Sequence, residues 1–370
     1  MRITEEEILH RIALNLVPGI GARTAATLLA TLGSAKAVLQ APARELLRIE
    51  GMGATRARAC RDPEIFRAAE RELNFVRQQG IRVLARGTEL YPQRLEQCAD
   101  APMLLFVKGE TNLEAPRCIA LIGTRKHTEY GQRLCEDLLA ALADCKDLLV
   151  ISGLAHGIDT IAHKASLRNR VPTAAVLGHG LHTIYPAGNK GLAADMLRQG
   201  GALVTEFTSG SNMDRGNFPA RNRIVAGLSD VTVVVESDTR GGALITALIA
   251  NSYNREVAAF PGRAYDHKSA GTNMLIRKNL AASICSAEDL LTLMNWDRPT
   301  VTKTVQARLA LALSGEETIV MDLLSGKDSL HADELLQQSG LSNSVLAATL
   351  LQLEMQGLVR ALPGKHYRGN

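Results

Sequence analysis

From about residue 117 onward, short apolar runs alternate with helical patterns, and this alternation limits the possible folds more than any other feature of the chain. Strands that alternate with helices form βαβ units, in which parallel strands share one sheet and helices cover both faces. The sequence therefore predicts an α/β fold, an extended Rossmann-like core with a mostly parallel sheet. Ligands are expected at the carboxyl ends of the strands, where the glycine-rich turns fall. The predicted strands are 118–122, 148–151, 173–177, 202–204, 231–235 and 257–260, with an extra edge strand near 104–109.

The core is expected to span residues 87–296, preceded by a helical domain at residues 1–86. This domain contains two short glycine hairpins, Gly19-Ile20-Gly21 and Gly51-Met52-Gly53. Each Gly-x-Gly lets the backbone turn tightly and leaves amides at the next helix start facing outward, which suits a phosphate. The pair resembles tandem helix-hairpin-helix motifs, so we expect a helix-hairpin-helix or SAM-like domain. Contact with a DNA backbone and simple packing of the hairpins both remain open.

Residues 297–315 are polar and irregular, and we expect them to form a linker. Residues 316–370 predict a small winged-helix-like domain. Its helices are expected at 316–324, 332–339 and 344–356, and two strands within 358–368 would form the wing.

The net charge of +4 is unevenly distributed. Residues 1–86 contain 14 Lys and Arg against 9 Asp and Glu, whereas residues 87–299 contain 22 of each. Residues 300–370 contain 6 against 7, so a protein-contact or packing role suits the C-terminal domain at least as well as DNA binding. The core has no general basic field, and polyanion binding there must depend on arginines focused at loops.

Composition excludes several classes of protein. An apolar content of 46% with 22% charged residues is typical of a globular chain. There is no apolar run of 18 residues and no signal-peptide pattern, so no membrane partner is expected. The six cysteines include no Cys-x-x-Cys pair, which argues against a zinc site or a disulfide framework and fits a reducing cytoplasm.

The most specific stretch of the chain is Gly-Asn-Phe-Pro-Ala-Arg-Asn-Arg at 216–223, with Arg215 directly before it. An aromatic ring can stack on an unpaired base, and guanidinium groups and helix-start amides bind phosphates. Core packing of the ring and a salt bridge for an arginine are the alternative interpretation. We favour a site for single-stranded nucleic acid, with these candidate contacts: Arg215, Phe218, Arg221, Asn222 and Arg223.

Other strand ends supply further candidates. The turn after the first core strand, Gly-Thr-Arg, can hold a single phosphate through its amides, its hydroxyl and its guanidinium group. The turn after the second strand offers a nest of outward amides. A helix cap or a plain turn is the simpler interpretation at each place. The candidate contacts on these loops are Gly123, Thr124, Arg125, Ser152, Gly153 and Gly157, and Lys190 is a further candidate after the third strand.

Several kinds of catalytic or cofactor site lack their usual signature. No Gly-x-Gly-x-x-Gly follows the first core strand and no Walker A motif occurs, so no nucleotide cofactor is expected. His156, Asp159 and His163 have helical spacing, but no further ligand cluster accompanies them, and we expect no metal. No Gly-x-Ser-x-Gly precedes a helix here, which argues against a Ser-His-Asp triad.

A series of motifs between about residues 91 and 290 closely resembles the DNA-processing protein A family (DprA, also called Smf), in order and in spacing. The flanking domains match the family in type. The motifs are Tyr91-Pro92, Gly123-Thr124-Arg125, Ser152-Gly153-Leu154-Ala155, Gly157-Ile158-Asp159, Ala175-Val176-Leu177-Gly178, Tyr185-Pro186, Phe218-Pro219, Arg221-Asn222-Arg223, Pro261-Gly262 and Gly271-Thr272-Asn273.

The resemblance implies a non-enzymatic recombination mediator. Such a protein binds single-stranded DNA, acts as a homodimer and loads RecA onto incoming DNA in natural transformation. Single-strand-binding protein is a further candidate partner. In the family the DNA pocket is formed by residues equivalent to Arg125, Arg215 and Phe218.

This chain departs from the family pattern at three places. Arg215 stands where lysine is usual, so the charge remains but the geometry of the donor differs. Gly241-Gly242-Ala243 replaces a run that usually carries two hydroxyl groups, and His156 stands where a small or basic residue is usual.

Two other functions compete with this interpretation. The first is a nucleotide-processing enzyme of the lysine-decarboxylase-like phosphoribohydrolase type, although the glutamate expected after Gly241-Gly242 is missing. The second is a transcriptional regulator that reads duplex DNA through its C-terminal domain.

Overall fold

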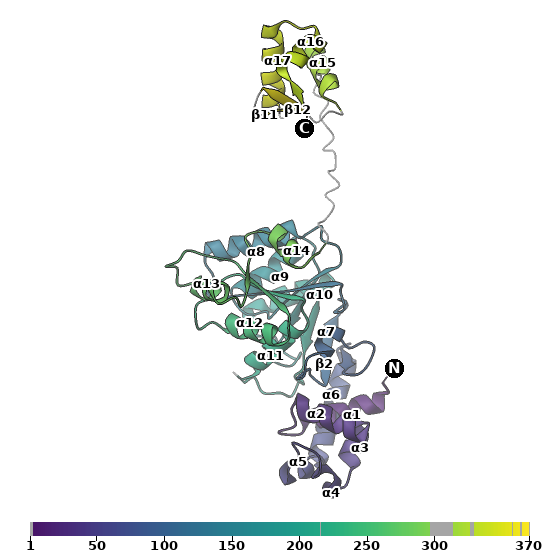
Figure 1. Cartoon of the computed structure of the whole chain (residues 1–370). Helices are drawn as coiled ribbons and strands as arrows, with labels where there is room; N and C mark the ends of the chain where they lie inside the picture. Colours follow the sequence, from purple (N-terminus) through teal and green to yellow (C-terminus); the bar gives the residue numbers. More distant parts are fainter. Residues whose placement is uncertain are drawn as a thin grey trace. The chain divides into compact units, whose positions relative to one another are not determined.

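The computed structural model describes residues 3–214, 216–296, 314–325, 329–356, 358–362 and 365–369. The chain divides into two compact units, Met1–Pro299 and Thr300–Asn370 (Figure 1). The larger unit contains the N-terminal helices and the sheet. The expected linker at 297–315 lies outside the described residues, apart from its last two positions.

A nine-stranded sheet forms the centre of the larger unit, in the order β1-β2-β6-β5-β4-β3-β7-β8-β9 among the described residues. All neighbouring strands from β6 to β9 are parallel, whereas β2 is antiparallel to both β1 and β6. This confirms the expected α/β fold with a mostly parallel sheet. The strands are β1 Arg82–Ala85, β2 Leu104–Gly109, β3 Arg117–Ile122, β4 Leu148–Ser152, β5 Thr173–Val176, β6 Ala202–Thr205, β7 Val231–Val234, β8 Glu256–Ala259 and β9 Ala282–Ser283.

The N-terminal edge of the sheet differs from the expectation. We expected helices up to residue 86 and an edge strand near 104–109. Instead, Arg82–Ala85 forms the outermost strand, and Leu104–Gly109 lies second, between it and β6. A four-residue strand that pairs on one side only, and begins with an exposed arginine, is too short to show a period of two.

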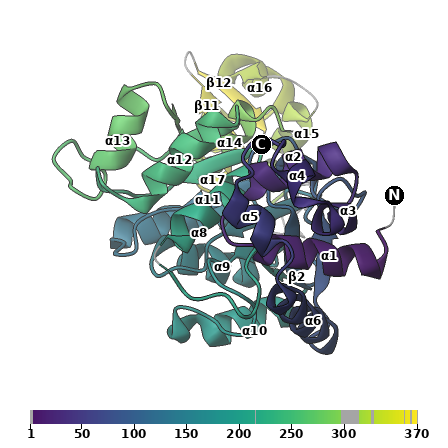
Figure 2. The same cartoon turned by 90° about the horizontal axis from the view of Figure 1, so that it is seen from below.

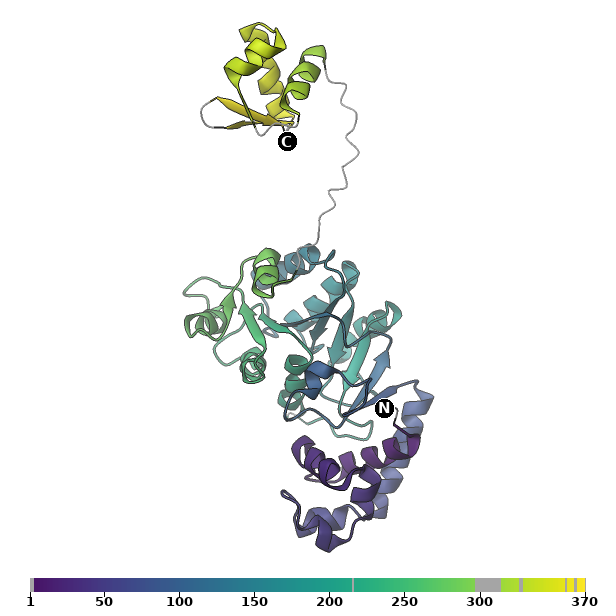
Figure 3. The same ribbon diagram turned by 45° about the vertical axis from the view of Figure 1, so that its right-hand side comes forward.

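Helices cover both faces of the sheet because each strand between β3 and β8 buries side chains on both sides (Figure 1, Figure 3). One core cluster joins the sheet to α7, α11, α12 and α13, and a second joins it to α8, α9 and α14. The helices are α7 Gln93–Glu96, α8 Glu129–Ala141, α9 Ile158–Arg168, the short 3-10 helix η1 Ala187–Asn189, α10 Lys190–Arg198, α11 Asn217–Gly227, α12 Gly242–Ser252, α13 Ala270–Arg277 and α14 Ala287–Leu293.

The N-terminal helices pack around a core of their own beside β2 (Figure 2). Successive side chains of a strand face opposite sides, and β2 uses both of them. Leu104 and Phe106 join the N-terminal core, whereas Leu105 and Val107 join the core beneath α11 and α12. The helices are α1 Glu5–Leu16, α2 Ala22–Leu32, α3 Ala35–Gln40, α4 Ala43–Leu46, α5 Ala54–Ala59 and α6 Pro63–Gln78.

The smaller unit is a winged-helix domain, as expected. Its three helices pack on a three-stranded sheet around Val320, Leu335, Leu350 and Leu353. The two-residue strand β10 was not predicted, and positions 363–364 of the expected wing lie outside the described residues. The elements are α15 Gly315–Leu324, β10 Leu330–His331, α16 Ala332–Ser339, α17 Asn343–Met355, β11 Val359–Leu362 and β12 His366–Gly369.

Candidate nucleic-acid interface

The sheet has a point where the direction of its connections reverses. The chain leaves β3 toward β4 on one side, and leaves β7 toward β8 on the other, although β3 and β7 are neighbours. In open α/β sheets, the crevice at the carboxyl ends of such strands is the usual place for a ligand. The Gly-Thr-Arg turn follows β3 at this point.

A buried carboxylate holds the turn after β3 in place. Thr124 donates its amide to the Glu236 carbonyl at 2.7 Å. Thr128, which caps α8, donates its amide and hydroxyl to the Glu236 carboxylate at 2.9 and 2.6 Å. Sequence reasoning missed Glu236, since an acidic residue at a strand end shows no periodicity and belongs to no motif that we used.

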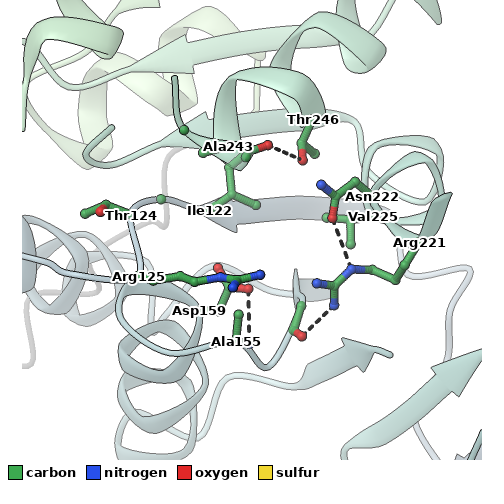
Figure 4. A pocket seen from close by; sticks show the side chains of 14 residues that line it. Ile122, Thr124, Arg125, Ala155, Asp159, Arg221, Asn222, Val225, Ala243 and Thr246 are labelled. Atoms are coloured by element: carbon green, nitrogen blue, oxygen red, sulfur yellow. Dashed lines mark hydrogen bonds between the residues drawn. The ribbon is translucent and has the colours of Figure 1, made fainter. Parts of the chain in front are cut away.

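A pocket of about 270 Å³ lies at this crevice (Figure 4). The side chains of Arg125 and Arg221 approach its interior from opposite sides, and Asp159 lies near the Arg125 guanidinium group (Figure 4). Four parts of the chain line the pocket: the turn after β3, the loop from β4 into α9, the buried side of α11 and the start of α12. The lining residues are Ile122, Gly123, Thr124, Arg125, Gly153, Ala155, Asp159, Arg221, Asn222, Val225, Gly241, Gly242, Ala243 and Thr246.

Beside this pocket, the Phe218 ring has both a cation and a second ring as close neighbours. The Arg125 guanidinium carbon is 5.9 Å from the centroid of the Phe218 ring. The Tyr185 ring lies 5.8 Å from that centroid, tilted by 48°. Phe218 is half-buried, while Arg125 and Tyr185 are exposed. Phe218 and Arg125 were predicted as DNA contacts from the sequence, whereas Tyr185 was named only as part of the Tyr185-Pro186 motif of the family resemblance.

Arg221 is buried beneath this surface. Its Nη1 donates to the carbonyl oxygens of Gly153, at 2.5 Å, and Val176, and its Nε donates to the Asn222 side chain at 3.1 Å. A Cβ on Gly153 would lie 2.4 Å from that Nη1, so a side chain there would displace the guanidinium group. The group expected to bind phosphate therefore has backbone carbonyls as its partners, and Asn222 orients it.

Asp159 partly balances this buried cation. Burial raises the pKa of the Asp159 carboxyl, while the charge of Arg221 and the Ala155 amide, at 3.3 Å, oppose the rise. Burial likewise lowers the pKa of Arg221, and Asp159 opposes that change. Each of these two buried groups therefore favours the ionised form of the other.

Arg223 and Ser152 also have interior partners. Arg223 pairs with Glu206, whose pKa is raised by burial and lowered by the arginine. The Ser152 hydroxyl is fully buried and donates to the Leu121 carbonyl at 2.6 Å. Neither residue is among those that line the pocket, and a direct phosphate contact of either one stays a prediction.

The remaining predicted contacts fall into two groups. Gly123 and Gly157 are needed for close packing, because an added Cβ would lie 2.5 Å from Ile158 and 2.2 Å from the Thr124 carbonyl oxygen, respectively. Lys190 is exposed at the start of α10, and Thr124 is partly exposed with its hydroxyl accepting from the Lys126 amide at 3.2 Å. Arg215 lies outside the described residues.

The described part of the chain contains no group of three His, Cys, Asp or Glu side chains placed to share a metal ion. His163, one of the residues weighed for such a site, is fully buried, and its Nδ1 lies 2.8 Å from the Thr173 hydroxyl. Within the same residues, no helix is both long and apolar enough to cross a membrane.

Protein-family comparison decides which of the competing functions applies. The family model for DNA recombination-mediator protein A matches residues 82–295, and the model for the DprA winged helix domain matches residues 305–365. The chain belongs to the DprA family. It is a recombination mediator of the kind that the family's description names.

Relatives support this assignment along most of the chain. Protein Smf of Escherichia coli is 34% identical over 312 residues, which cover 82% of this chain and 81% of the relative. The X-ray structure of DprA from Streptococcus pneumoniae matches with a TM-score of 0.63 and 29% identity, covering 79% of this chain and 98% of that one. A Helicobacter pylori DprA structure, described as showing a unique single-stranded DNA binding mode, matches with a TM-score of 0.52 and 29% identity. That match covers 59% of this chain and 97% of the other.

Proposed function

We propose that this recombination mediator binds single-stranded DNA at the surface formed by Arg125, Phe218 and Tyr185, and that it has no catalytic activity of its own. The observation that carries the proposal is the half-buried Phe218 ring, which has an exposed guanidinium group and an exposed second ring as close neighbours. Flat apolar faces accept bases of any sequence, and a cation beside them holds the backbone. The single-stranded DNA named for the Helicobacter pylori relative supports this choice of ligand.

The interior residues of the site support the surface in this proposal. Arg221 joins the ends of β4 and β5 through the Gly153 and Val176 carbonyls, and Glu236 fixes the turn that carries Arg125. Phosphates would then contact Arg125, Lys190, Thr124 and the amides around Gly123. Arg223 and Ser152 would keep the surface in shape without contacting the strand.

The geometry favours binding over catalysis. A phosphoribohydrolase needs a carboxylate free to act on its substrate. Asp159, the carboxylate among the residues that line this pocket, is buried and accepts the Ala155 amide, and Glu236 behind the turn is buried and accepts the Thr128 amide. Counted from Gly241, Leu248 stands where the Gly-Gly-x-Gly-Thr-x-x-Glu motif of that enzyme class places its glutamate.

The wider role follows from the family. We propose that the protein acts in a reducing cytoplasm, as its six free cysteines suit, and that a homodimer loads RecA onto the bound strand. Single-strand-binding protein is proposed as a further partner. RecA filament assembly on a strand coated with that protein, with and without this chain, tests the loading step.

The first prediction concerns the ring and the cation. We expect Phe218→Ala to weaken binding of a labelled poly-dT oligomer by ~1–3 kcal/mol, the usual contribution of one base–aromatic stack. Arg125→Ala should also weaken binding and should flatten its dependence on salt. Fluorescence anisotropy at two salt concentrations measures both effects.

Matched controls lie elsewhere on the same unit. Tyr265→Ala removes a ring that is 98% exposed, and Arg133→Ala removes an exposed arginine of α8. Both should bind like the unaltered protein. If the Phe218 and Arg125 variants bind the oligomer as tightly as the unaltered protein does, the strand binds elsewhere. Displacement of the oligomer by AMP would instead support the nucleotide-processing enzyme.

A further inference from the structure

The loop that leads from β6 to the Phe218 segment makes few hydrogen bonds with the rest of the core. Within the described residues, the hydrogen bonds of positions 209–217 are either local to the loop and α11 or go to one carboxylate. Local examples are the Asn217 side chain on the Asn212 carbonyl at 3.1 Å and the Gly216 amide on Asp214 at 3.0 Å. Local bonds of this kind shape a loop but do not anchor it.

Among the described residues, the hydrogen-bond partner that this loop finds outside itself and α11 comes from the N-terminal domain. Glu72 of α6 accepts the Ser209 amide on both carboxylate oxygens, at 2.9 and 2.8 Å, and accepts the Ser209 hydroxyl as well. Glu72 is only 5% exposed, although it lies on a helix whose other acidic residues, Glu64 and Glu70, are exposed. Hydrogen bonds to an ionised acceptor are stronger than neutral ones, and a buried carboxylate is costly without them.

The loop after β5, which also belongs to the proposed site, packs against the same part of the β6–α11 loop. A Cβ on Gly180 would lie 2.3 Å from the Thr208 carbonyl oxygen, so the loop after β5 lies directly against the start of the β6–α11 loop. Leu181 of that loop packs on the N-terminal core. The same loop continues to Tyr185, whose ring lies beside Phe218.

We propose that Glu72 is a positioning residue for the DNA site. By holding Ser209, it fixes the loop that carries Phe218 and keeps it against the loop that carries Tyr185. The N-terminal helices would then set the fraction of molecules whose two rings are arranged to receive a base. This inference rests on the proposed function of the Phe218 surface.

The test uses the full chain and the same poly-dT oligomer. Glu72→Ala is expected to weaken binding by about tenfold, because the apparent affinity falls with the fraction of molecules in the competent arrangement. Glu70→Gln, an exposed position on the same helix, is the control and should bind normally. Hydrogen exchange should rise across residues 208–218 in the Glu72 variant and remain unchanged in β4 and β5.

A double-mutant cycle separates positioning from general damage to the fold. Ser209→Ala removes only the hydroxyl donor and should weaken binding by less than Glu72→Ala. The Ser209 substitution should then have no further effect once Glu72 is gone, because both act through one contact. Additive effects, or unchanged exchange across residues 208–218, would overturn the inference.

The outcomes also distinguish this inference from the proposed function. If Phe218→Ala weakens binding while Glu72→Ala behaves like Glu70→Gln, the DNA site stands and Glu72 has no positioning role. If Phe218→Ala has no effect, the proposed site itself fails, whatever the Glu72 variant does.

Discussion

Two arginines of the site, Arg125 and Arg221, show how the same side chain can have opposite roles. Arg125 is exposed and faces the Phe218 ring, whereas Arg221 is 5% exposed and donates to two carbonyls. A guanidinium group in a dry interior requires hydrogen-bond partners, and the ends of β4 and β5 provide them. From the sequence alone, both arginines are predicted as phosphate contacts. The sequence does not show which of them is buried, because burial depends on strands that are distant along the chain.

His163 provides a prediction at the same scale. Burial lowers the pKa of this histidine to about 3, from the 6.5 expected when the chain is unfolded. Between these values only the unfolded chain binds the extra proton. The contribution of neutral His163 to the free energy of unfolding is therefore complete above pH 6.5, and it is lost as the pH falls toward 3.

We expect this residue alone to reduce the free energy of unfolding by about 1.4 kcal/mol for each pH unit below 6.5. His163→Asn, which cannot titrate, should show a correspondingly smaller decline in urea unfolding between pH 7.5 and 4.5. Equal slopes for the two proteins would mean that His163 is accessible to protons in the folded state.

At the scale of elements, the site depends on how closely the turn after β3 approaches the start of α9. Gly157 has a φ of 80°, and a Cβ there would lie 2.2 Å from the Thr124 carbonyl oxygen and 2.7 Å from the Arg125 Cα. Both the backbone conformation and the contact exclude a side chain. The turn that carries Arg125 therefore packs directly against the glycine that precedes α9.

Gly157→Ala should therefore destabilise the protein by about 2 kcal/mol or more. It should also weaken single-strand binding, because the Arg125 turn must move. Gly188→Ala is the control, since that glycine has open space where a Cβ would be added and should change stability by less than ~0.5 kcal/mol. Urea unfolding measures the first effect and anisotropy the second. A stable Gly157 variant that binds less well would show that the turn adjusts by moving Arg125 alone.

Elements with a clear period were predictable, and contacts between distant segments were not. The buried runs that form β3 to β8 stand out in the sequence, as do the three helices of the winged-helix domain. The strands β9 and β10 have two residues each and show no period. Glu72 and Glu236 resemble ordinary acidic residues in the sequence. Their roles arise from Ser209 and Thr128, with which the fold brings them into contact.

At the scale of the whole molecule, the two units have separate cores. The smaller core contains eight buried apolar residues, all from the winged-helix domain. Leu353 of α17 is fully buried in it, whereas Leu351 of the same helix is 60% exposed. Each unit is therefore expected to unfold by its own transition.

Leu353→Ala should destabilise the winged-helix domain by about 2–5 kcal/mol, the usual cost of removing a buried leucine side chain. In calorimetry of the full chain, the transition of this domain should move to lower temperature and that of the larger unit should stay in place. Leu351→Ala should move neither. Single-strand affinity is expected to be unchanged in both variants. A single common transition that shifts as a whole would show that the two units are thermodynamically coupled.

The order of strands also has a consequence for the nascent chain. Phe106 of β2 pairs with Thr205 of β6, and β3, β4 and β5 are synthesised between them. The antiparallel β1–β2 pair therefore emerges early from the ribosome, and the free edge of β2 stays unpaired until β6 arrives. An open strand edge invites pairing with other chains, and contacts between distant residues form slowly. The N-terminal helices are thus made first, yet their attachment to the sheet is completed only after half of the core has been synthesised.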